Sequence, residues 1–73
     1  MPDWFERLVQ EEKELHEKWR NLAIFKTSKE FSELDYLEQE YLIIQAEHMW
    51  NYLSVLRKRI TLEESKYMKN FVK

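Results

Sequence analysis

The sequence predicts an all-α protein, an antiparallel helical hairpin with a short helix between its two arms. Glycine is absent and proline occurs once, as Pro2, which disfavours tight β-hairpin turns and leaves helices unbroken. Apolar residues recur at helical spacing, and helix-capping signatures punctuate the chain. Because 73 residues suffice for one domain, we expect a single hairpin domain over residues 1–73.

The first helix is expected to begin near Asp3. Pro2 and Asp3 are typical of a helix entry, and Glu6 is spaced to close a capping box with Asp3. An apolar stripe follows, formed by Leu8, Leu15, Trp19 and Leu22. This pattern predicts an amphipathic helix that ends around Phe25 or Lys26.

A second capping signature separates the first helix from a short one. Thr27 and Glu30 form the S/T-x-x-E pattern, which predicts a short helix over residues 28–34. Asp35 and Glu38 repeat the signature, so a long helix should start there and run to about Ile60.

The long helix carries two apolar stripes. The first has the four-three spacing of left-handed helix packing and comprises Leu42, Ala46, Met49, Leu53, Leu56 and Ile60. The second comprises Leu37, Tyr41, Ile44, His48, Tyr52 and Val55. One stripe suffices for packing against the first helix, so we expect the second to face another subunit.

A third capping signature, Thr61 with Glu64, predicts a separate C-terminal extension over residues 61–73. Its apolar residues, Tyr67, Met68 and Phe71, are expected to form a further helix or an arm.

Composition favours self-association and argues against several classes of function. Hydrophobic residues make up 44% of the chain, more than a small hairpin hides internally, so we expect a homo-oligomer.

The net charge of −2 argues against a general DNA binder. With no cysteine, no signal-peptide pattern and no apolar run longer than residues 22–25, we expect a cytoplasmic protein that does not span a membrane.

No metal-binding or catalytic motif is complete. Arg20 breaks the H-E-x-x-H pattern that begins at His16, and Gln45 stands where a di-iron motif needs glutamate before His48. The simpler interpretation is an exposed His16 and a hydrogen-bonded His48 in a packed seam. The acidic residues resemble ordinary surface patterning. We therefore expect no catalytic residue, no metal and no cofactor, and hence no enzyme.

Two basic clusters could bind an anion. Lys26-Thr27-Ser28-Lys29 places ammonium groups and hydroxyls at a helix start, where unpaired amides attract anions. The alternative is a plain capped turn with solvated lysines. Arg57-Lys58-Arg59 lies at the expected end of the long helix, where cations also favour the helix dipole.

Aromatic residues lie near these charges in the sequence. Trp19 follows Lys18, and Tyr52 precedes Arg57 by five residues. Aromatic faces with fixed cations suit a planar base attached to phosphate, although aromatics at helical spacing more often belong to a core. The candidate ligand-binding residues are Lys18, Trp19, Lys26, Thr27, Ser28, Tyr52, Arg57 and Arg59.

Three stretches of the chain share a pattern with a known family: Leu15-x-x-Lys18-x-x-x-Leu22-x-x-Phe25, then Phe31-x-x-Leu34, then Gln45-x-x-x-Met49-x-x-Tyr52-x-x-x-Leu56-x-x-Arg59-Ile60. They resemble a hairpin domain of small bacteriophage proteins, shared by the anti-CBASS cyclic-nucleotide sponge and the Thoeris anti-defence sponge. The resemblance spans about residues 7–60, and its last stretch is the most distinctive.

The resemblance implies sequestration without chemistry. Such proteins bind cyclic di- or trinucleotide signals, or signals of the cyclic ADP-ribose type, in the infected bacterial cell. They assemble as homo-oligomers, typically hexamers, with ligand pockets between subunits. A tyrosine near the family's N-terminus has no clear counterpart, and Trp4 and Phe5 are the candidates to replace it. The alternative function is a helical interaction module, an adaptor or inhibitor, whose second stripe binds another protein.

Overall fold

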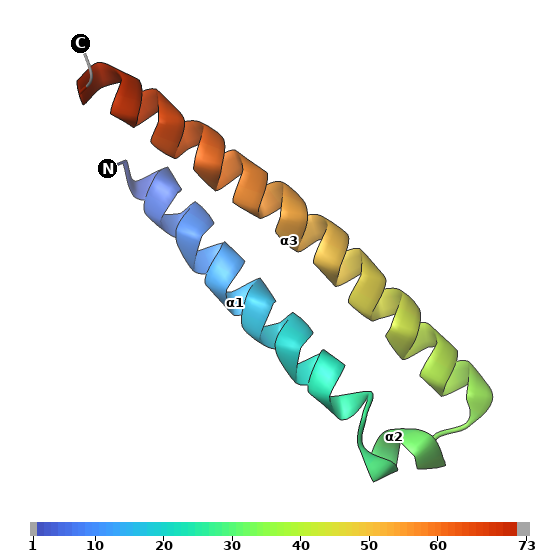
Figure 1. The fold of residues 1–73 in the computed structure, drawn as a ribbon. Coiled ribbons are helices and arrows are strands. Elements are labelled where there is room, and N and C mark those ends of the chain that lie inside the picture. Colours follow the sequence, from blue (N-terminus) through green and yellow to red (C-terminus); the bar gives the residue numbers. More distant parts are fainter. Residues whose placement is uncertain (1, 72–73) are drawn as a thin grey trace.

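A computed structural model describes the backbone of residues 2–71 and the side chains of residues 2–67. It contains three helices, α1 (Asp3–Phe25), α2 (Lys29–Glu33) and α3 (Tyr36–Phe71). The two long helices lie side by side and antiparallel, and α2 crosses the end of the hairpin opposite the termini (Figure 1). The molecule measures 58 × 17 × 15 Å. The predicted all-α hairpin with a short intervening helix is confirmed.

Helix α1 begins without the predicted capping box. The N-cap is Pro2, whose carbonyl accepts hydrogen bonds from the amides of Phe5 (3.0 Å) and Glu6 (3.3 Å), and no side chain caps the helix. Asp3 is already helical, whereas a capping residue needs extended backbone angles. The predicted pairing of Asp3 with Glu6 is therefore wrong, while the end of α1 at Phe25 lies where it was expected.

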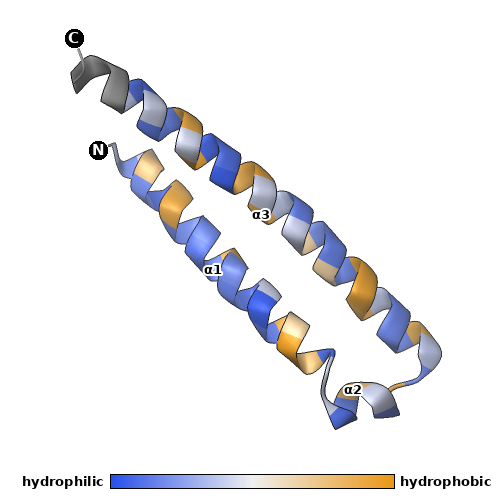
Figure 2. Cartoon of the chain, viewed as in Figure 1, coloured by the Kyte–Doolittle hydropathy of each residue, from blue (hydrophilic) through white to orange (hydrophobic). Residues whose placement is uncertain are grey.

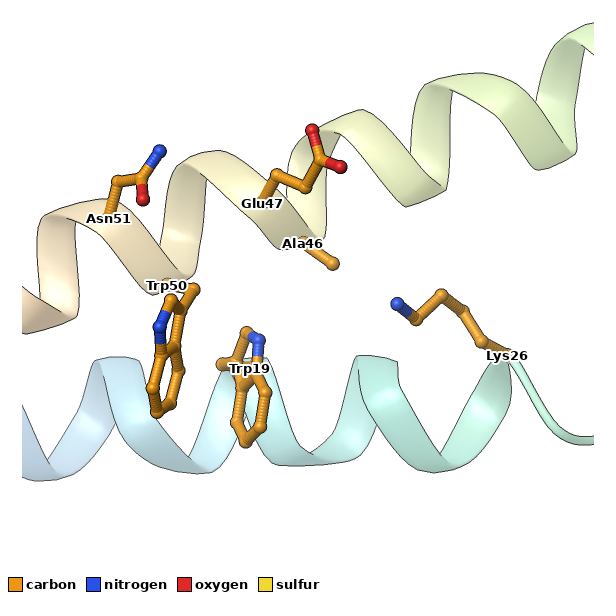
Figure 3. A pocket seen from close by; sticks show the side chains of 6 residues that line it. All are labelled: Trp19, Lys26, Ala46, Glu47, Trp50 and Asn51. Atoms are coloured by element: carbon orange, nitrogen blue, oxygen red, sulfur yellow. The ribbon is translucent and has the colours of Figure 1, made fainter.

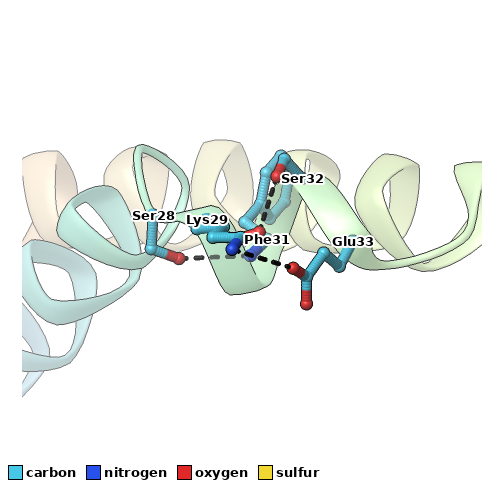
Figure 4. A network of polar contacts seen from close by, with 5 residues as sticks. All are labelled: Ser28, Lys29, Phe31, Ser32 and Glu33. Carbon is cyan, nitrogen blue, oxygen red and sulfur yellow. Dashed lines mark hydrogen bonds and ion pairs between the residues drawn. The ribbon is translucent and has the colours of Figure 1, made fainter.

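The cap of α2 lies one residue later than predicted. Ser28, not Thr27, has the extended backbone of an N-cap, and its Oγ accepts a hydrogen bond from the amide of Phe31 at 3.1 Å (Figure 4). The amide of Thr27 donates to the carbonyl of Ile24 and so still belongs to the last turn of α1. Because of this shift, α2 spans only Lys29–Glu33.

The start of α3 matches the prediction. The Oδ1 atom of Asp35 accepts a hydrogen bond from the amide of Glu38 at 3.0 Å, which is the expected cap. One turn further, the side-chain amide of Gln39 donates to the carbonyls of Phe31 (2.9 Å) and Leu34 (3.0 Å). These bonds satisfy carbonyls at the end of α2 and fix the corner of the hairpin.

Helix α3 does not end near Ile60 as predicted; it continues unbroken to Phe71. No glycine or proline interrupts this part of the chain, so the Thr61–Glu64 signature lies inside a helix. The ring of Tyr67 packs edge-on against Phe5, with centroids 6.4 Å apart. The predicted extension therefore forms the last turns of the hairpin, and residues 72 and 73 lie outside the described part.

The core follows the predicted seam between the two long helices. Its buried residues are Phe5 and Leu8 from α1 and Ala46, Leu53 and Leu56 from α3. Leu53 and Leu56 are fully buried, and burying side chains of this size contributes about 1.5–3 kcal/mol each. The other members of the seam are partly buried. The first stripe of α3 is thereby confirmed as the face that packs on α1.

The second stripe of α3 lies on the surface of the single chain. Tyr41 is 65% exposed, and every other member of this stripe is also exposed. Apolar residues therefore recur on two faces of α3, the face that packs on α1 and the exposed face, and Figure 2 shows hydrophobic segments repeated along the helix. His48 belongs to this exposed stripe, so the seam that packs on α1 within the single chain does not include it. His16, expected to be exposed, is half-buried against Trp19.

Candidate ligand-binding site

The hairpin has two side faces, and the candidate residues are divided between them. Positions two residues apart on a helix point about 200° apart, so Trp50 and Tyr52 project to opposite sides of α3. We call the side with Trp50, Arg57, Trp19 and Lys26 the tryptophan face. The opposite side, which carries the second stripe, is the tyrosine face.

A hollow of about 320 Å³ opens between α1 and α3 on the tryptophan face. It is lined by Trp19, Lys26, Ala46, Glu47, Trp50 and Asn51. The two indole rings lie together at one end, with centroids 4.7 Å apart and planes inclined by 42°. Figure 3 shows the amine of Lys26 extending from α1 into the gap between the helices, at the other end of the hollow.

The indole rings are held in place by neighbours on both helices. The imidazole of His16 stacks on Trp19 with centroids 6.2 Å apart, and the guanidinium of Arg57 lies 5.7 Å from the centre of the Trp50 ring. Arg57 Nε also donates to Glu12 Oε1 at 3.1 Å, which joins α3 to α1. The aromatic wall is therefore positioned before any ligand arrives.

The chemistry of this hollow suits a small anionic ligand with a planar ring. The indoles offer apolar surface against which a base can pack, and Lys26 offers a cation to a phosphate. Glu47 and Asn51, one turn apart on α3, also line the hollow, where the Glu47 carboxylate can accept hydrogen bonds from the N–H groups of a base. Such an arrangement can bind and orient a ligand.

Three of the predicted residues lie on the tyrosine face instead. The hydroxyl of Tyr52 donates to Glu11 Oε2, and this bond raises the pKa of Tyr52, while the more distant charge of Arg59 lowers it slightly. Arg59 follows Tyr52 by seven residues and shares its side of α3. Lys18 follows Glu11 by seven residues and shares its side of α1. These residues therefore point away from the hollow.

The hydroxyls of the turn are engaged in local hydrogen bonds. Thr27 Oγ1 donates to the carbonyl of Ile24 at 2.8 Å, and Ser28 Oγ donates to the carbonyl of Phe25 at 2.6 Å. These bonds close the end of α1, so the turn has the geometry of a plain capped turn. Within the described part of the turn cluster, Lys26 is the residue that lines the hollow.

The structure thus unites Trp19 and Lys26 in one hollow and places Arg57 beside it through Trp50. It does not bring Lys18, Tyr52 or Arg59 to the same place. Sequence reasoning missed Trp50, Glu47 and Asn51. A signal for Trp50 did exist, because it precedes Arg57 by seven residues and must share its side of the helix.

The structure is a helical hairpin with a hollow between its two arms. Among the described residues, no three His, Cys, Asp or Glu side chains are grouped so that they could hold a metal ion. No helix in the same part of the chain is long and apolar enough to cross a membrane.

The sequence model of the Sequestin family matches residues 2–62, so the chain belongs to the Sequestin family of phage cyclic-nucleotide sponge proteins. This confirms the resemblance to phage sponges that the sequence predicts. The family indicates a binding, sequestering role. No curated protein and no solved structure matches the chain.

Proposed function

We propose that the protein sequesters cyclic oligonucleotide immune signals without cleaving them, and so blocks anti-phage defence of the CBASS or Thoeris type. Its place of action is the cytoplasm of the infected bacterium. The observation that carries this proposal is the hollow in which Trp19, Trp50 and Lys26 combine aromatic surface with a cation. Membership of the Sequestin family supports the sequestering role, and the hollow supports a nucleotide as the ligand.

Two kinds of interaction contribute to the free energy of binding in the hollow: aromatic stacking and charge. A base packed on Trp19 or Trp50 gains about 1–3 kcal/mol. A phosphate oxygen can accept a charge-assisted hydrogen bond from Lys26, which is stronger than a neutral one. Arg57 adds positive potential nearby, although its Nε is already bonded to Glu12. Since a sponge acts by mass action, tight binding and abundance suffice and no catalytic group is needed.

The other candidate residues can reach a ligand only when copies of the chain assemble. Lys18, Tyr52 and Arg59 point away from the hollow, and the hydroxyls of Thr27 and Ser28 are already bonded within the turn. We propose a homo-oligomer, a hexamer by resemblance to the phage sponges, in which a second copy covers the open hollow. The large exposed apolar surface of α3 supports assembly.

Thermal melting with a panel of cyclic dinucleotides, cyclic trinucleotides and cyclic ADP-ribose tests the proposal. A ligand that binds only the folded state stabilises it by about 2.7 kcal/mol at a hundredfold excess over the dissociation constant. We expect at least one member of the panel to raise the melting temperature clearly. If none does, the sponge function proposed for this chain is wrong.

A pair of lysine variants locates the site. Lys26→Ala should weaken ligand binding by about 1.5–3 kcal/mol, as expected for a hydrogen bond to a charged group. Lys29→Ala is the matched control, because Lys29 is three residues away, its side chain is 87% exposed and it pairs only loosely with Glu33 at 3.9 Å. Equal affinities for the two variants would place the phosphate elsewhere, at Arg57 or Arg59.

A second candidate function is a protein-interaction module. The exposed tyrosine face favours it, since Tyr41, Tyr52 and Val55 present apolar surface to solvent in the single chain. This function predicts that no cyclic nucleotide changes the melting temperature. It also predicts that Tyr41→Ser abolishes binding of a different protein, whereas the sponge function predicts that the nucleotide still binds.

A further inference from the structure

The exposed stripe of the tyrosine face has a spacing that reads the same in both directions. The stripe continues to Arg59 and comprises Leu37, Tyr41, Ile44, His48, Tyr52, Val55 and Arg59. Its steps are four, three, four, four, three and four residues, so the pattern is symmetric about His48. A groove of about 560 Å³ runs along the middle of the stripe, with Leu15 of α1 at its edge.

A symmetric stripe is what a two-fold interface between identical helices requires. In such an interface, a residue on the axis faces its own equivalent, and every other residue faces the position at the same distance on the other side. An axis at His48 would place Tyr41 opposite Val55 of the second copy and Ile44 opposite Tyr52 of the second copy. Apolar and aromatic side chains would then meet over the central part of the stripe, from Tyr41 to Val55, with His48 on the axis, and Leu37 would lie opposite Arg59 of the second copy at each end.

We propose that two copies of this chain pair antiparallel along α3, through the tyrosine face, about a two-fold axis at His48. The inference draws on the self-association in the proposed function but not on the identity of the ligand. It leaves the tryptophan face and its hollow uncovered by this contact. Tyr52 and Arg59 form part of this contact between the two copies.

The distribution of charge on α3 selects the antiparallel orientation. The first half of the helix carries Glu38, Glu40 and Glu47, whereas Arg57, Lys58 and Arg59 follow in the second half. Distances along the helix follow from the rise of about 1.5 Å per residue. Lys58 lies about 15 Å from the two-fold axis, and Glu40 of the second copy lies about 12 Å from the axis in the same direction. Opposite charges therefore meet at both ends of the stripe. A parallel pair would instead set like charges level with one another.

Single cysteines test this arrangement, because the chain has none of its own. His48→Cys puts a thiol on the proposed axis, where two helices in face-to-face contact bring the Cα atoms within disulfide range. Val55→Cys is the matched control. It lies on the same exposed stripe, yet an antiparallel pair holds its two copies about 21 Å apart. Both positions are exposed, so neither change should disturb the hairpin, and circular dichroism checks this.

Under mild oxidation we expect His48→Cys to cross-link into a dimer at least about tenfold faster than Val55→Cys, since only the first thiol meets its equivalent. A mixture of Tyr41→Cys and Val55→Cys chains should give the mixed dimer in preference to either self-linked product. Equal rates for His48→Cys and Val55→Cys would indicate a parallel pair and overturn the proposal. A monomer by light scattering, or an oligomer in which His48→Cys does not cross-link, would overturn it too.

A charge exchange provides an independent check. Lys58→Glu should weaken pairing, measured by sedimentation, because two carboxylates then face each other at each end of the stripe. Adding Glu40→Lys to the same chain restores opposite charges and should recover the pairing. Lack of recovery in a folded double variant would contradict the antiparallel register. Cyclic-nucleotide binding, measured separately by calorimetry on the same proteins, shows whether the sponge function holds regardless of this interface.

Discussion

The indole rings of Trp19 and Trp50, one from each arm of the hairpin, lie with their centroids 4.7 Å apart and their planes at 42°. Aromatic pairs at this distance contribute about 0.5–1.5 kcal/mol beyond the area that they bury. The pair both joins α1 to α3 and forms one wall of the hollow that contains Lys26. Packing and ligand binding therefore depend on the same two side chains.

The first prediction concerns the ring that sequence reasoning missed. Trp50→Phe should keep the hairpin folded but lower ligand affinity by up to about 1 kcal/mol, because the smaller ring keeps only part of a stacking interaction worth about 1–3 kcal/mol. The same change should remove the near-ultraviolet circular dichroism that arises from two interacting indoles. Trp4→Phe is the control, because Trp4 is 44% exposed and packs against Phe5, far from the hollow. An unchanged affinity in Trp50→Phe would show that the base binds elsewhere.

The second prediction concerns the seam. Leu53 is fully buried between the helices, so Leu53→Ala should cost about 2–5 kcal/mol in the free energy of unfolding. Ile43→Ala serves as the control, since Ile43 is 42% exposed and its truncation should cost much less. Urea titrations at one fixed protein concentration compare the two, because association also stabilises the fold. A loss below about half a kilocalorie for Leu53→Ala would be incompatible with this core.

The third prediction distinguishes the two hydroxyls of the turn. Ser28→Ala removes the side chain that caps α2 and should destabilise the protein by about 1 kcal/mol. Thr27→Ala removes only an exposed bond to the carbonyl of Ile24, so a change within about half a kilocalorie is expected. Thermal melts of both variants measure the difference. A larger loss of stability in Thr27→Ala than in Ser28→Ala would instead indicate that Thr27 caps α2, as the sequence predicts.

The fourth prediction concerns alkaline pH. The hydrogen bond to Glu11 raises the pKa of Tyr52 above its ordinary value of 10.0, so the fold favours the protonated phenol. The resulting stabilisation is fully present below pH 10 and is lost as the pH rises through the raised pKa. Tyr52→Phe should therefore show a shallower loss of melting temperature above pH 10 than the wild type.

Tyr36→Phe is the comparison for this titration. The pKa of Tyr36 is also raised, by its hydrogen bond to Glu40 within α3, so this change should also make the alkaline loss of melting temperature shallower, without removing a bond between the two arms. An alkaline melting profile of Tyr52→Phe identical to that of the wild type would show that the bond between Tyr52 and Glu11 does not support the hairpin.

The hairpin and its seam could be predicted because they depend on local and periodic signals. The four-three spacing that includes Leu53 and Leu56 marks the face of α3 that packs on α1, and the Asp35 cap marks where that helix starts. Three errors came from the limits of capping motifs. Asp3 begins a capping pattern, but it already belongs to α1, and Pro2 is the N-cap. Thr27 and Ser28 both carry a hydroxyl, so the motif alone does not say which one caps. Thr61 begins a capping pattern inside a helix that no glycine or proline ends.

The candidate site was harder to predict because it depends on the register between two helices. Lys26 and Trp19 could be named from the sequence, but their meeting with Trp50 depends on which turn of α3 lies beside which turn of α1. The same register decides that Arg57 pairs with Glu12 while Tyr52 bonds to Glu11 on the other side. Spacing along one helix assigns a residue to a face of that helix, but it does not predict which side chains of the neighbouring helix lie opposite that residue.

Equilibrium dialysis of the wild-type protein against a cyclic nucleotide that raises its melting temperature tests the central claim most directly. The account predicts that the free ligand concentration falls in proportion to added protein. It also predicts that heat denaturation releases the ligand chemically intact, and that Lys26→Ala retains much less of it than Lys29→Ala does. A free ligand concentration that stays unchanged in the presence of folded protein, or a ligand that is recovered cleaved, would contradict sequestration.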